Sequence, residues 1–259
     1  MPKITFVGLG IREFDQLTLE GLHVLQRAER IFYLATRSDR VEDRLNRLGF
    51  NLIENLGRLY KNGALDTDNY KAILRRIVQA TKVYSNICVL LPGHPRVGVT
   101  LVYWLEELKD TLGLEITVLE GISSFCSMIN ELRIDPLEHG AALMDANRVL
   151  QQDQPLNPTI DCFIYHVCSV GVQATHLSDP SRENRLDLLQ IKLQKHYHNE
   201  HPVTLISSSR GSEESTLKKM GTVGTLTDLL PHVHFGTTLY IPAYSRKGAH
   251  HEHNNHSNS

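Results

Sequence analysis

Hydrophobic and polar positions follow two distinct rhythms along the first half of the chain. Short runs of apolar and β-branched residues, which are typical of strands buried on both faces, occupy residues 4–7, 31–35, 51–54, 86–91 and 115–119. Between them, apolar residues recur at helical spacing over 17–30, 41–48, 70–82 and 97–108, and Thr18 is placed to cap the first of these helices. Strands that alternate with helices predict βαβ units around a parallel sheet.

The pattern changes after residue 120. Helices are expected over 125–132, 145–150 and 185–197, strands over 161–167, 203–206 and 237–242, and a turn followed by a helix over 222–230. We therefore predict an α/β fold with two α/β domains, residues 1–120 and 121–245. The segment 246–259 is rich in His, Asn and Ser and has almost nothing to bury, so we expect a disordered tail.

The amino-acid composition argues against some classes of binding partner. Hydrophobic residues make up 41% of the 259 positions and charged residues 22%, which is ordinary for a globular protein. A formal net charge of −2 argues against binding to nucleic acid or to a membrane surface. No apolar stretch approaches the roughly 18–20 residues that span a bilayer, and the first strand begins too early to leave room for a signal peptide. The four cysteines form no CxxC pair and are expected to be free, buried thiols, which favours the cytoplasm.

Glycine loops follow several of the predicted strands. The first, at residues 8–10, lacks the third glycine of the dinucleotide fingerprint, because position 13 is Glu and a polar stretch separates the loop from its helix. Similar loops occur at 92–95 and 121–124 and before Gly171, and Ser207–Gly211 reads as a strand-end turn near the same edge. Ligands of α/β sheets bind beyond the carboxyl ends of the strands, and glycine lets a backbone approach them closely. The residues alone leave open whether these loops bind a ligand or only turn the chain.

The order of these motifs resembles the tetrapyrrole methylase superfamily of S-adenosylmethionine-dependent methyltransferases. The resemblance runs from residue 4 to about 243 and is carried by residues 7–10, 17–19, 28–33, 92–95 and 120–124. It is closest to two branches, the methylase-like half of nucleotide pyrophosphatase fusions and the borosin-type peptide backbone N-methyltransferases. Both share the glycine-histidine-proline loop and the Ile134-Asp135-Pro136 step, and the second also shares a helix like the one at 185–197.

This resemblance implies a cofactor in the cleft between the two domains, and usually a homodimer. The family holds S-adenosylmethionine largely through backbone groups: the methionine end by the loop at 92–97, the methionine or ribose end by 122–123, and the adenine by 166–167 and 238–239. The cofactor-binding residues implied here are Pro92, Gly93, His94, Val97, Ile122, Ser123, His166, Val167, Thr238 and Leu239.

Tyr60 and Tyr70 are the candidate catalytic residues, because they match two tyrosines of the borosin-type enzymes. The arginine that those enzymes place four residues before the second tyrosine is replaced here by Asp66, and Pro92 replaces a further tyrosine. An amide nitrogen is a very weak acid, so loss of the cation counts against methylation of a backbone amide. The alternative for both tyrosines is ordinary amphipathic packing.

The expected function is methyl transfer from S-adenosylmethionine to a peptide or to a small molecule. A peptide acceptor could be a separate precursor chain. One alternative is C-methylation of a tetrapyrrole, which requires a cleft rich in Arg and His for many carboxylates. The other is a non-catalytic binding or regulatory module that has kept the fold. We expect no functional metal, because His196, His198 and His201 do not share one helix face and the tail histidines have no fixed frame.

Overall fold

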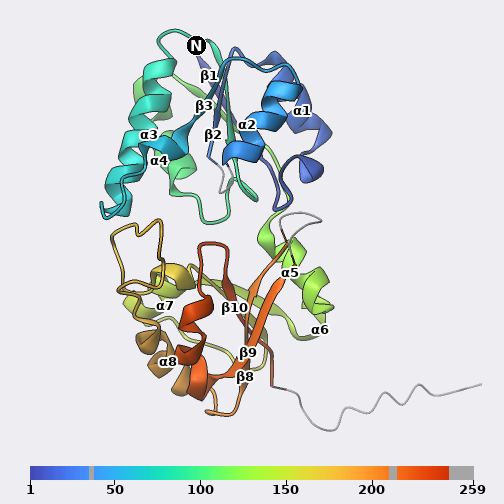
Figure 1. Ribbon diagram of the computed structural model, residues 1–259, viewed down its shortest axis with the longest axis vertical. Coiled ribbons are helices and arrows are strands. Elements are labelled where there is room, and N and C mark those ends of the chain that lie inside the picture. Colours follow the sequence, from blue (N-terminus) through green and yellow to red (C-terminus); the bar gives the residue numbers. More distant parts are fainter. Residues whose placement is uncertain (35–37, 210–214, 245–259) are drawn as a thin grey trace, which may run out of the picture.

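The computed structural model describes residues 1–34, 38–209 and 215–244. Two five-stranded sheets, each with its own helices, follow one another along the long axis of the molecule (Figure 1). The strands of the first sheet fall within residues 3–118 and those of the second within 141–241. The α/β fold is confirmed, whereas the predicted disordered tail at 246–259 lies outside the described residues, as do Ala35 and the positions 210–211 of the predicted serine turn.

The first sheet is parallel throughout, as the alternation of strands and helices predicts. Its spatial order is β3-β2-β4-β1-β5. The strands are β1 (Lys3–Gly8), β2 (Arg30–Tyr33), β3 (Ile53–Asn55), β4 (Asn86–Leu91) and β5 (Glu115–Val118). Because the strands all run in the same direction, their carboxyl ends lie at the same edge of the sheet, and crossover connections join them.

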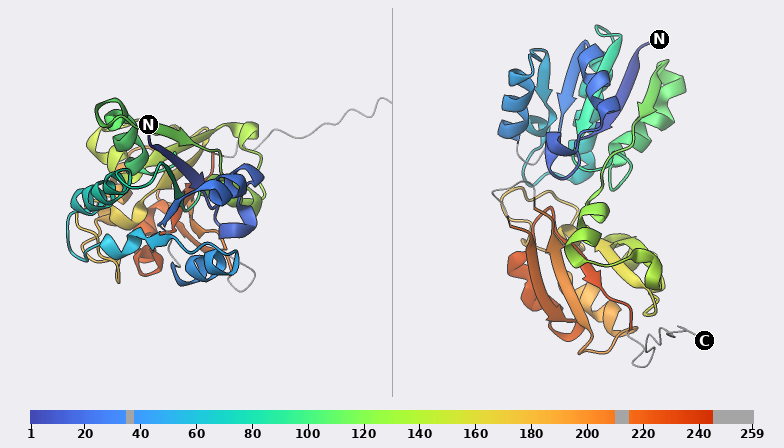
Figure 2. Two further views of the ribbon diagram at one scale, coloured as in Figure 1. Left: turned by 90° about the horizontal axis from the view of Figure 1, so that it is seen from above. Right: turned by 90° about the vertical axis from the view of Figure 1, so that its right-hand side faces the viewer.

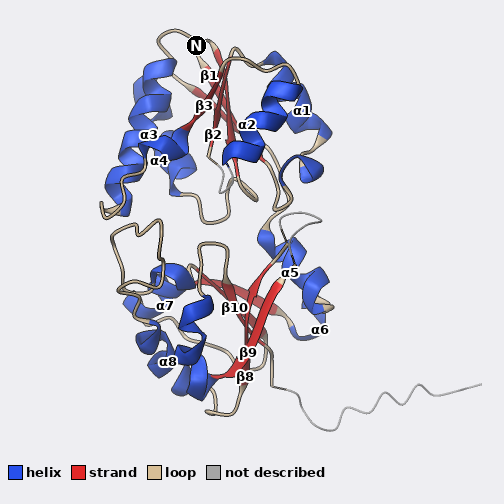
Figure 3. Cartoon of the chain, viewed as in Figure 1, coloured by secondary structure: helices blue, strands red, loops and turns tan. Residues whose placement is uncertain are grey.

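Helices cover both faces of this sheet (Figure 3). They are α1 (Leu19–Arg27), α2 (Ser38–Arg47), α3 (Asp66–Ala80) and α4 (Thr100–Leu112), with the short 3-10 helices η1 (Glu13–Gln16) and η2 (Leu56–Leu59). Side chains of β1 alternate between the faces, with Phe6 in the core under α3 and α4 and Val7 in the core under α1. Thr18 caps α1 by accepting a hydrogen bond from the Gly21 backbone N–H at 3.0 Å.

The second sheet is mixed, with the order β6-β7-β10-β8-β9 and a single parallel pair, β6 with β7. Its strands are β6 (Ala141–Asp145), β7 (Asp161–Tyr165), β8 (Pro202–Ser207), β9 (Leu217–Thr222) and β10 (Thr238–Ile241). The helices α7 (Ala146–Gln151) and α8 (Leu186–Gln194), and the 3-10 helix η4 (Val223–His232), pack on one face. The other face packs against α5 (Ser124–Leu132). The short elements α6 (Pro136–His139) and η3 (Val167–Ser169) complete the domain.

The carboxyl ends of the first sheet's strands face the second domain (Figure 2). The chain passes from the first domain to the second just before α5. At a separate contact between the domains, residues 62–66 pair with residues 173–177, and we call this contact the inter-domain ladder. The backbone N–H of Gly63 donates to the Thr175 carbonyl at 2.8 Å, and that of Thr175 donates to the Ala64 carbonyl at 2.9 Å. Leu65 and Ala174 form an antiparallel bridge next to these bonds, and the Asp66 N–H donates to the Gln173 carbonyl on its other side. The ladder therefore fixes the start of α3 against the second domain.

Cysteine burial differs from expectation at one position. Cys88, Cys162 and Cys168 are free and buried, as predicted, but Cys126 is exposed. The reason is its place on α5, whose buried residue is Met128, so that Cys126 falls on another side of the helix. In the described part of the chain, no helix is long and apolar enough to cross a membrane.

Candidate functional site

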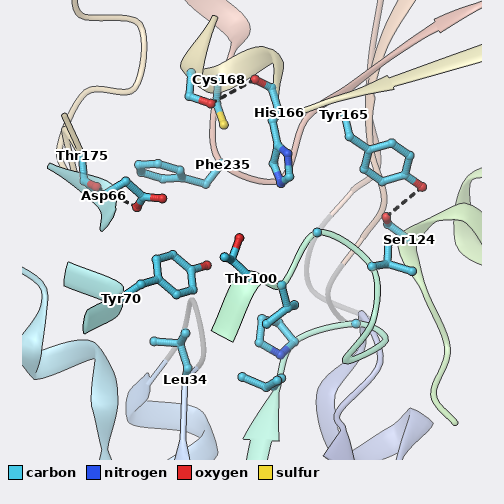
Figure 4. Close-up of a pocket in the computed structure, with 18 of the residues that line it drawn as sticks. Leu34, Asp66, Tyr70, Thr100, Ser124, Tyr165, His166, Cys168, Thr175 and Phe235 are labelled. Atoms are coloured by element: carbon cyan, nitrogen blue, oxygen red, sulfur yellow. Dashed lines mark hydrogen bonds between the residues drawn. The ribbon is translucent and has the colours of Figure 1, made fainter. Parts of the chain in front are cut away.

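A cavity of about 2110 Å³ lies between the two domains and is lined by residues of both. Single-ligand pockets are usually about 300–1,000 Å³. The cavity therefore has room for a nucleoside-sized ligand and part of a second molecule. Figure 4 shows side chains from both domains that point into it.

The floor of the cavity is built from three glycine loops that touch one another. Gly10 and Gly93 form an antiparallel bridge, in which the Gly93 N–H donates to the Gly10 carbonyl at 2.9 Å. A Cβ atom at Gly8 would lie 2.4 Å from the Gly93 carbonyl oxygen and 3.3 Å from the Gly121 Cα. Contacts under 3 Å to backbone atoms leave no room for a side chain at Gly8. The loops after β1, β4 and β5 therefore act as one unit.

Gly93 itself has the left-handed φ of +69° that favours glycine. The space above its Cα is open, because only Ile11 Cδ1, at 3.7 Å, would lie within 4 Å of a Cβ there. The next residue, His94, accepts a hydrogen bond from the Arg96 backbone N–H through Nδ1 at 3.1 Å. His94 thus shapes the turn, and Gly93 is a buried residue that lines the cavity without a side chain.

His166 lies on the opposite wall, just after β7. Its backbone is left-handed, with a φ of 58°, and its Nδ1 lies 2.6 Å from Asp145 Oδ2. A Cβ at Gly98 would come within 3.0 Å of the imidazole Cε1 and Nε2. The ring of His166 therefore sits between Asp145 of its own domain and the β4–α4 loop of the other, and it points into the cavity in Figure 4.

Ser208, at the end of β8, also lines the cavity. Its hydroxyl is buried and has no hydrogen-bond partner among the described residues. A buried polar group without a partner costs about 1–3 kcal/mol. The sequence pattern predicts a strand-end turn near the cleft at this position.

Most of the predicted cofactor-binding residues line the cavity: Pro92, Gly93, His94, Val97, Ser123, His166 and Thr238. Ile122, Val167 and Leu239 are not among the lining residues. The side chains of Val167 and Leu239 are fully buried in the core of the second domain, because they follow or alternate with residues that face the cavity. Their predicted contacts use backbone groups and stay predictions.

The two candidate catalytic tyrosines lie together at the cavity wall. The rings of Tyr60 and Tyr70 meet edge to face with centroids 6.1 Å apart, and Tyr70 meets Trp104 of α4 in the same way at 6.2 Å. All three are half-buried and line the cavity, as does the exposed ring of Phe235. We call Tyr60, Tyr70, Trp104 and Phe235 the aromatic subsite. Tyr60 and Tyr70 also pack on the core of the first domain. Each side chain therefore both packs on the core and lines the cavity.

Both phenols are held in the neutral form. Burial, followed by the Tyr70 phenol and the Asp66 carboxylate, raises the pKa of Tyr60 well above its usual value. Burial also raises the pKa of Tyr70, with a hydrogen bond from Tyr60 opposing the rise and Asp66 adding to it. A phenolate is therefore disfavoured at this wall.

Asp66 is the first residue of α3 and stands at the end of the inter-domain ladder. Its backbone N–H donates to the Gln173 carbonyl at 2.9 Å, and its Oδ1 accepts a hydrogen bond from the Thr175 hydroxyl at 3.0 Å. Asp66 is an exposed residue on the cavity wall. Partial loss of solvent around its carboxyl raises the pKa of Asp66, against the hydrogen bond from Thr175 and the charge of His166, which lower it. The carboxylate is thus fixed between the domains.

Sequence reasoning missed several residues of this site. The pattern predicts Asp145 at the start of a helix, where its carboxylate accepts a hydrogen bond from the Arg148 backbone N–H. It does not predict the contact of Asp145 with His166. Thr175 and Phe235 lie in segments for which the pattern predicts no element. Trp104 had a detectable signal, since it is the one tryptophan of the chain and falls in the predicted helix after the glycine-histidine-proline loop.

Curated proteins named as methyltransferases joined to cyclic-peptide precursors are similar to this chain. The chain is 25% identical over 252 residues to the methyltransferase/ribosomally synthesized cyclic peptide lentinulin A precursor of Lentinula edodes, a match covering 95% of this chain and 58% of that protein. It is 24% identical over 249 residues to the corresponding omphalotin A precursor of Omphalotus olearius, covering 95% of this chain and 59% of that protein. The chain thus spans less than two thirds of the length of these relatives.

Solved structures share the fold. Uroporphyrin-III-C-methyltransferase from Thermus thermophilus superimposes with a TM-score of 0.64 at 16% identity, covering 93% of this chain and 92% of that one. A diphthine synthase gives a TM-score of 0.60 at 14% identity, with coverages of 93% and 90%. Residues 3–209 match the family described as Tetrapyrrole (Corrin/Porphyrin) Methylases, and the chain belongs to this family.

Proposed function

We propose that the protein is an S-adenosylmethionine-dependent methyltransferase whose acceptor is a peptide. The observation that carries the proposal is the cavity between the domains, which is lined by the three loops that the Gly8–Gly93–Gly121 contact holds together. Membership of a methylase family supports the reaction, and the printed names of the curated relatives support the acceptor.

The residues present fit the cofactor. The open space above Gly93 admits a ligand against backbone, and Ser123, His166 and Thr238 line the same cavity. Pro92, Gly93 and Val97 would hold the methionine end, Ser123 the methionine or ribose end, and the backbone at His166 and Thr238 the adenine. When bound, S-adenosylmethionine supplies a methyl group activated by its sulfonium sulfur. The protein's part is to hold donor and acceptor close together and away from bulk water.

The volume of the cavity supports a second molecule beside the cofactor. Its wall carries exposed apolar side chains from both domains, among them Leu65, Leu143 and Leu177. Extended peptide segments bind to surfaces of this type through apolar side chains. The homodimer and the separate precursor implied by the family resemblance remain predictions, and light scattering tests the first of them.

Methyl transfer is tested by mass spectrometry. We expect that incubation with S-adenosylmethionine and a peptide mixture yields peptides heavier by one CH2 group, together with S-adenosylhomocysteine. Fragmentation of the product locates the methyl group. If S-adenosylmethionine binds but no peptide gains mass, while a small-molecule or tetrapyrrole acceptor does, the acceptor class proposed here is wrong.

Tyr70→Phe separates a hydrogen-bonding role from a base role. Because the phenols are neutral, we expect the hydroxyl to orient the acceptor, and its loss to lower kcat/KM by about five- to tenfold, the value of one hydrogen bond. Loss of a general base typically costs about 10²–10⁴-fold. Steady-state kinetics with calorimetry of cofactor binding makes the distinction. Tyr84→Phe, in the same core but outside the cavity lining, is the control. Unchanged kinetics in Tyr70→Phe would leave packing as its sole role.

A further inference from the structure

The acceptor side of the cavity has an unusual combination of groups. One carboxylate, Asp66, lies beside the aromatic subsite (Tyr60, Tyr70, Trp104 and Phe235), and all five side chains line the same cavity. Figure 4 shows Asp66 between the ring of Phe235 and the ring of Tyr70, with the Thr100 hydroxyl facing them. Carboxylates and aromatic faces share one preference, which is for cations.

The carboxylate is held in place rather than free to turn away. Thr175 donates to one of its oxygens at 3.0 Å, and the inter-domain ladder fixes its backbone. Oδ1 is engaged by Thr175, so that Oδ2 is available toward the cavity. Arg96, a cation on the same cavity wall, is bound by both oxygens of Glu106 at 2.7 and 3.0 Å. That arginine is therefore occupied outside the Asp66 subsite.

We propose that the methyl acceptor is a primary amine of the peptide, bound as an ammonium ion between the Asp66 carboxylate and the aromatic subsite. This inference rests on the proposed methyltransferase function and narrows its acceptor atom. Deprotonation of a backbone amide would develop negative charge on the acceptor, which a neighbouring carboxylate opposes. An ammonium ion brings positive charge, which the carboxylate and the ring faces stabilise.

The proton balance follows from the same geometry. The ammonium N–H bond breaks, its electron pair stays on nitrogen, and the proton bonds to a carboxylate oxygen of Asp66. The freed lone pair forms the new N–C bond as the methyl–sulfur bond of the donor breaks and its electrons remain on sulfur. Solvent reaches Asp66 through the cavity and removes the proton.

The test uses Trp104, the one tryptophan of the chain, whose ring contacts Tyr70 in the subsite. The probe is a short peptide with a free N-terminal amine and one lysine, and its neutral counterpart is the same peptide with both amines acetylated. We expect the amine peptide to change Trp104 fluorescence saturably and to bind at least tenfold more tightly than the acetylated one. Charged hydrogen bonds exceed neutral ones by about this factor.

Asp66→Asn removes the charge but keeps an oxygen that can accept from Thr175, so we expect the fold to persist and the tenfold preference to disappear. The control is Asp68→Asn, two residues along α3, whose side chain is 61% exposed and lies outside the cavity lining. It should keep the full preference. Thermal unfolding of both variants checks that neither has lost its structure.

Three outcomes overturn the proposal: equal binding of the two peptides, a preference that survives Asp66→Asn, or methyl groups located on backbone amides. The proposed function fails separately if the protein prefers the amine peptide in an Asp66-dependent way but does not bind S-adenosylmethionine and methylates neither peptide.

Discussion

Gly93→Val should abolish binding of S-adenosylmethionine while leaving a folded protein. Gly93 has a φ of +69°, and the position of its Cβ is open except for Ile11 Cδ1 at 3.7 Å, so a valine side chain would project into space left for the ligand. We expect affinity to fall by at least about 100-fold, which corresponds to about 2.7 kcal/mol. Calorimetry measures the loss directly. A β-branched residue with positive φ also strains the backbone by about 1–2 kcal/mol, which a control must separate.

Gly49→Val supplies that control. Gly49 follows α2, has a φ of +86°, and has nothing within 4 Å of a Cβ position, so it carries the same backbone strain without a ligand nearby. It should lose a similar amount of stability in urea and keep cofactor affinity. If Gly93→Val bound S-adenosylmethionine as tightly as Gly49→Val does, the loop at Gly93 would be only a turn.

Gly8→Ala should disrupt the cavity floor, even though it adds only one methyl group. Its Cβ would lie 2.4 Å from the Gly93 carbonyl oxygen, 3.0 Å from Pro95 Cδ and 3.3 Å from the Gly121 Cα, so two loops must move. Overpacking of this kind costs about 1–3 kcal/mol of unfolding free energy, and the displaced Gly93 loop should also lose the cofactor. Urea unfolding and calorimetry measure the two effects.

Gly21→Ala is the control for Gly8→Ala, because it adds the same methyl group at a crowded glycine outside the cavity lining. A Cβ there would lie 2.8 Å from Val7 Cγ1 and 2.9 Å from Leu17 Cδ1, which are ends of side chains that can shift. We expect a smaller change in stability, partly offset by the better helix propensity of alanine, and unchanged cofactor affinity. Unchanged cofactor affinity in Gly8→Ala would show that the contact of the three loops does not shape the binding site.

The parallel sheet and the glycine loops were predictable because their signals are local. Near-continuous apolar strands such as residues 86–91, several of them followed by a glycine loop, indicate both the sheet and the edge at which its loops meet. Two strands of the second sheet carried no such signal. Ala141–Asp145 is rich in helix formers, and Leu217–Thr222 is an edge strand with two lysines, so pairing with neighbours overrides local propensity in both.

The Asp66 subsite could be predicted only in part. The family resemblance drew attention to Tyr60, Asp66 and Tyr70, but the partner of Asp66 is Thr175, 109 residues away along the chain. The helical pattern also predicted that α3 begins at residue 70, whereas it begins at Asp66. The first turn of this helix is polar and has no apolar periodicity, so the pattern could not place the carboxylate. Contacts of this range arise from the docking of domains and leave no trace in local composition.

Calorimetric titration of the protein with S-adenosylmethionine and S-adenosylhomocysteine tests the central claim most directly. We predict saturable binding with a dissociation constant in the micromolar range or tighter, or about −8 kcal/mol or more favourable, and a raised Tm at excess ligand. NAD should give neither heat nor a shift, because the first glycine loop lacks the dinucleotide fingerprint and η1 separates it from α1. No heat and no thermal shift with either sulfur ligand would contradict the assignment of the cavity as a cofactor site.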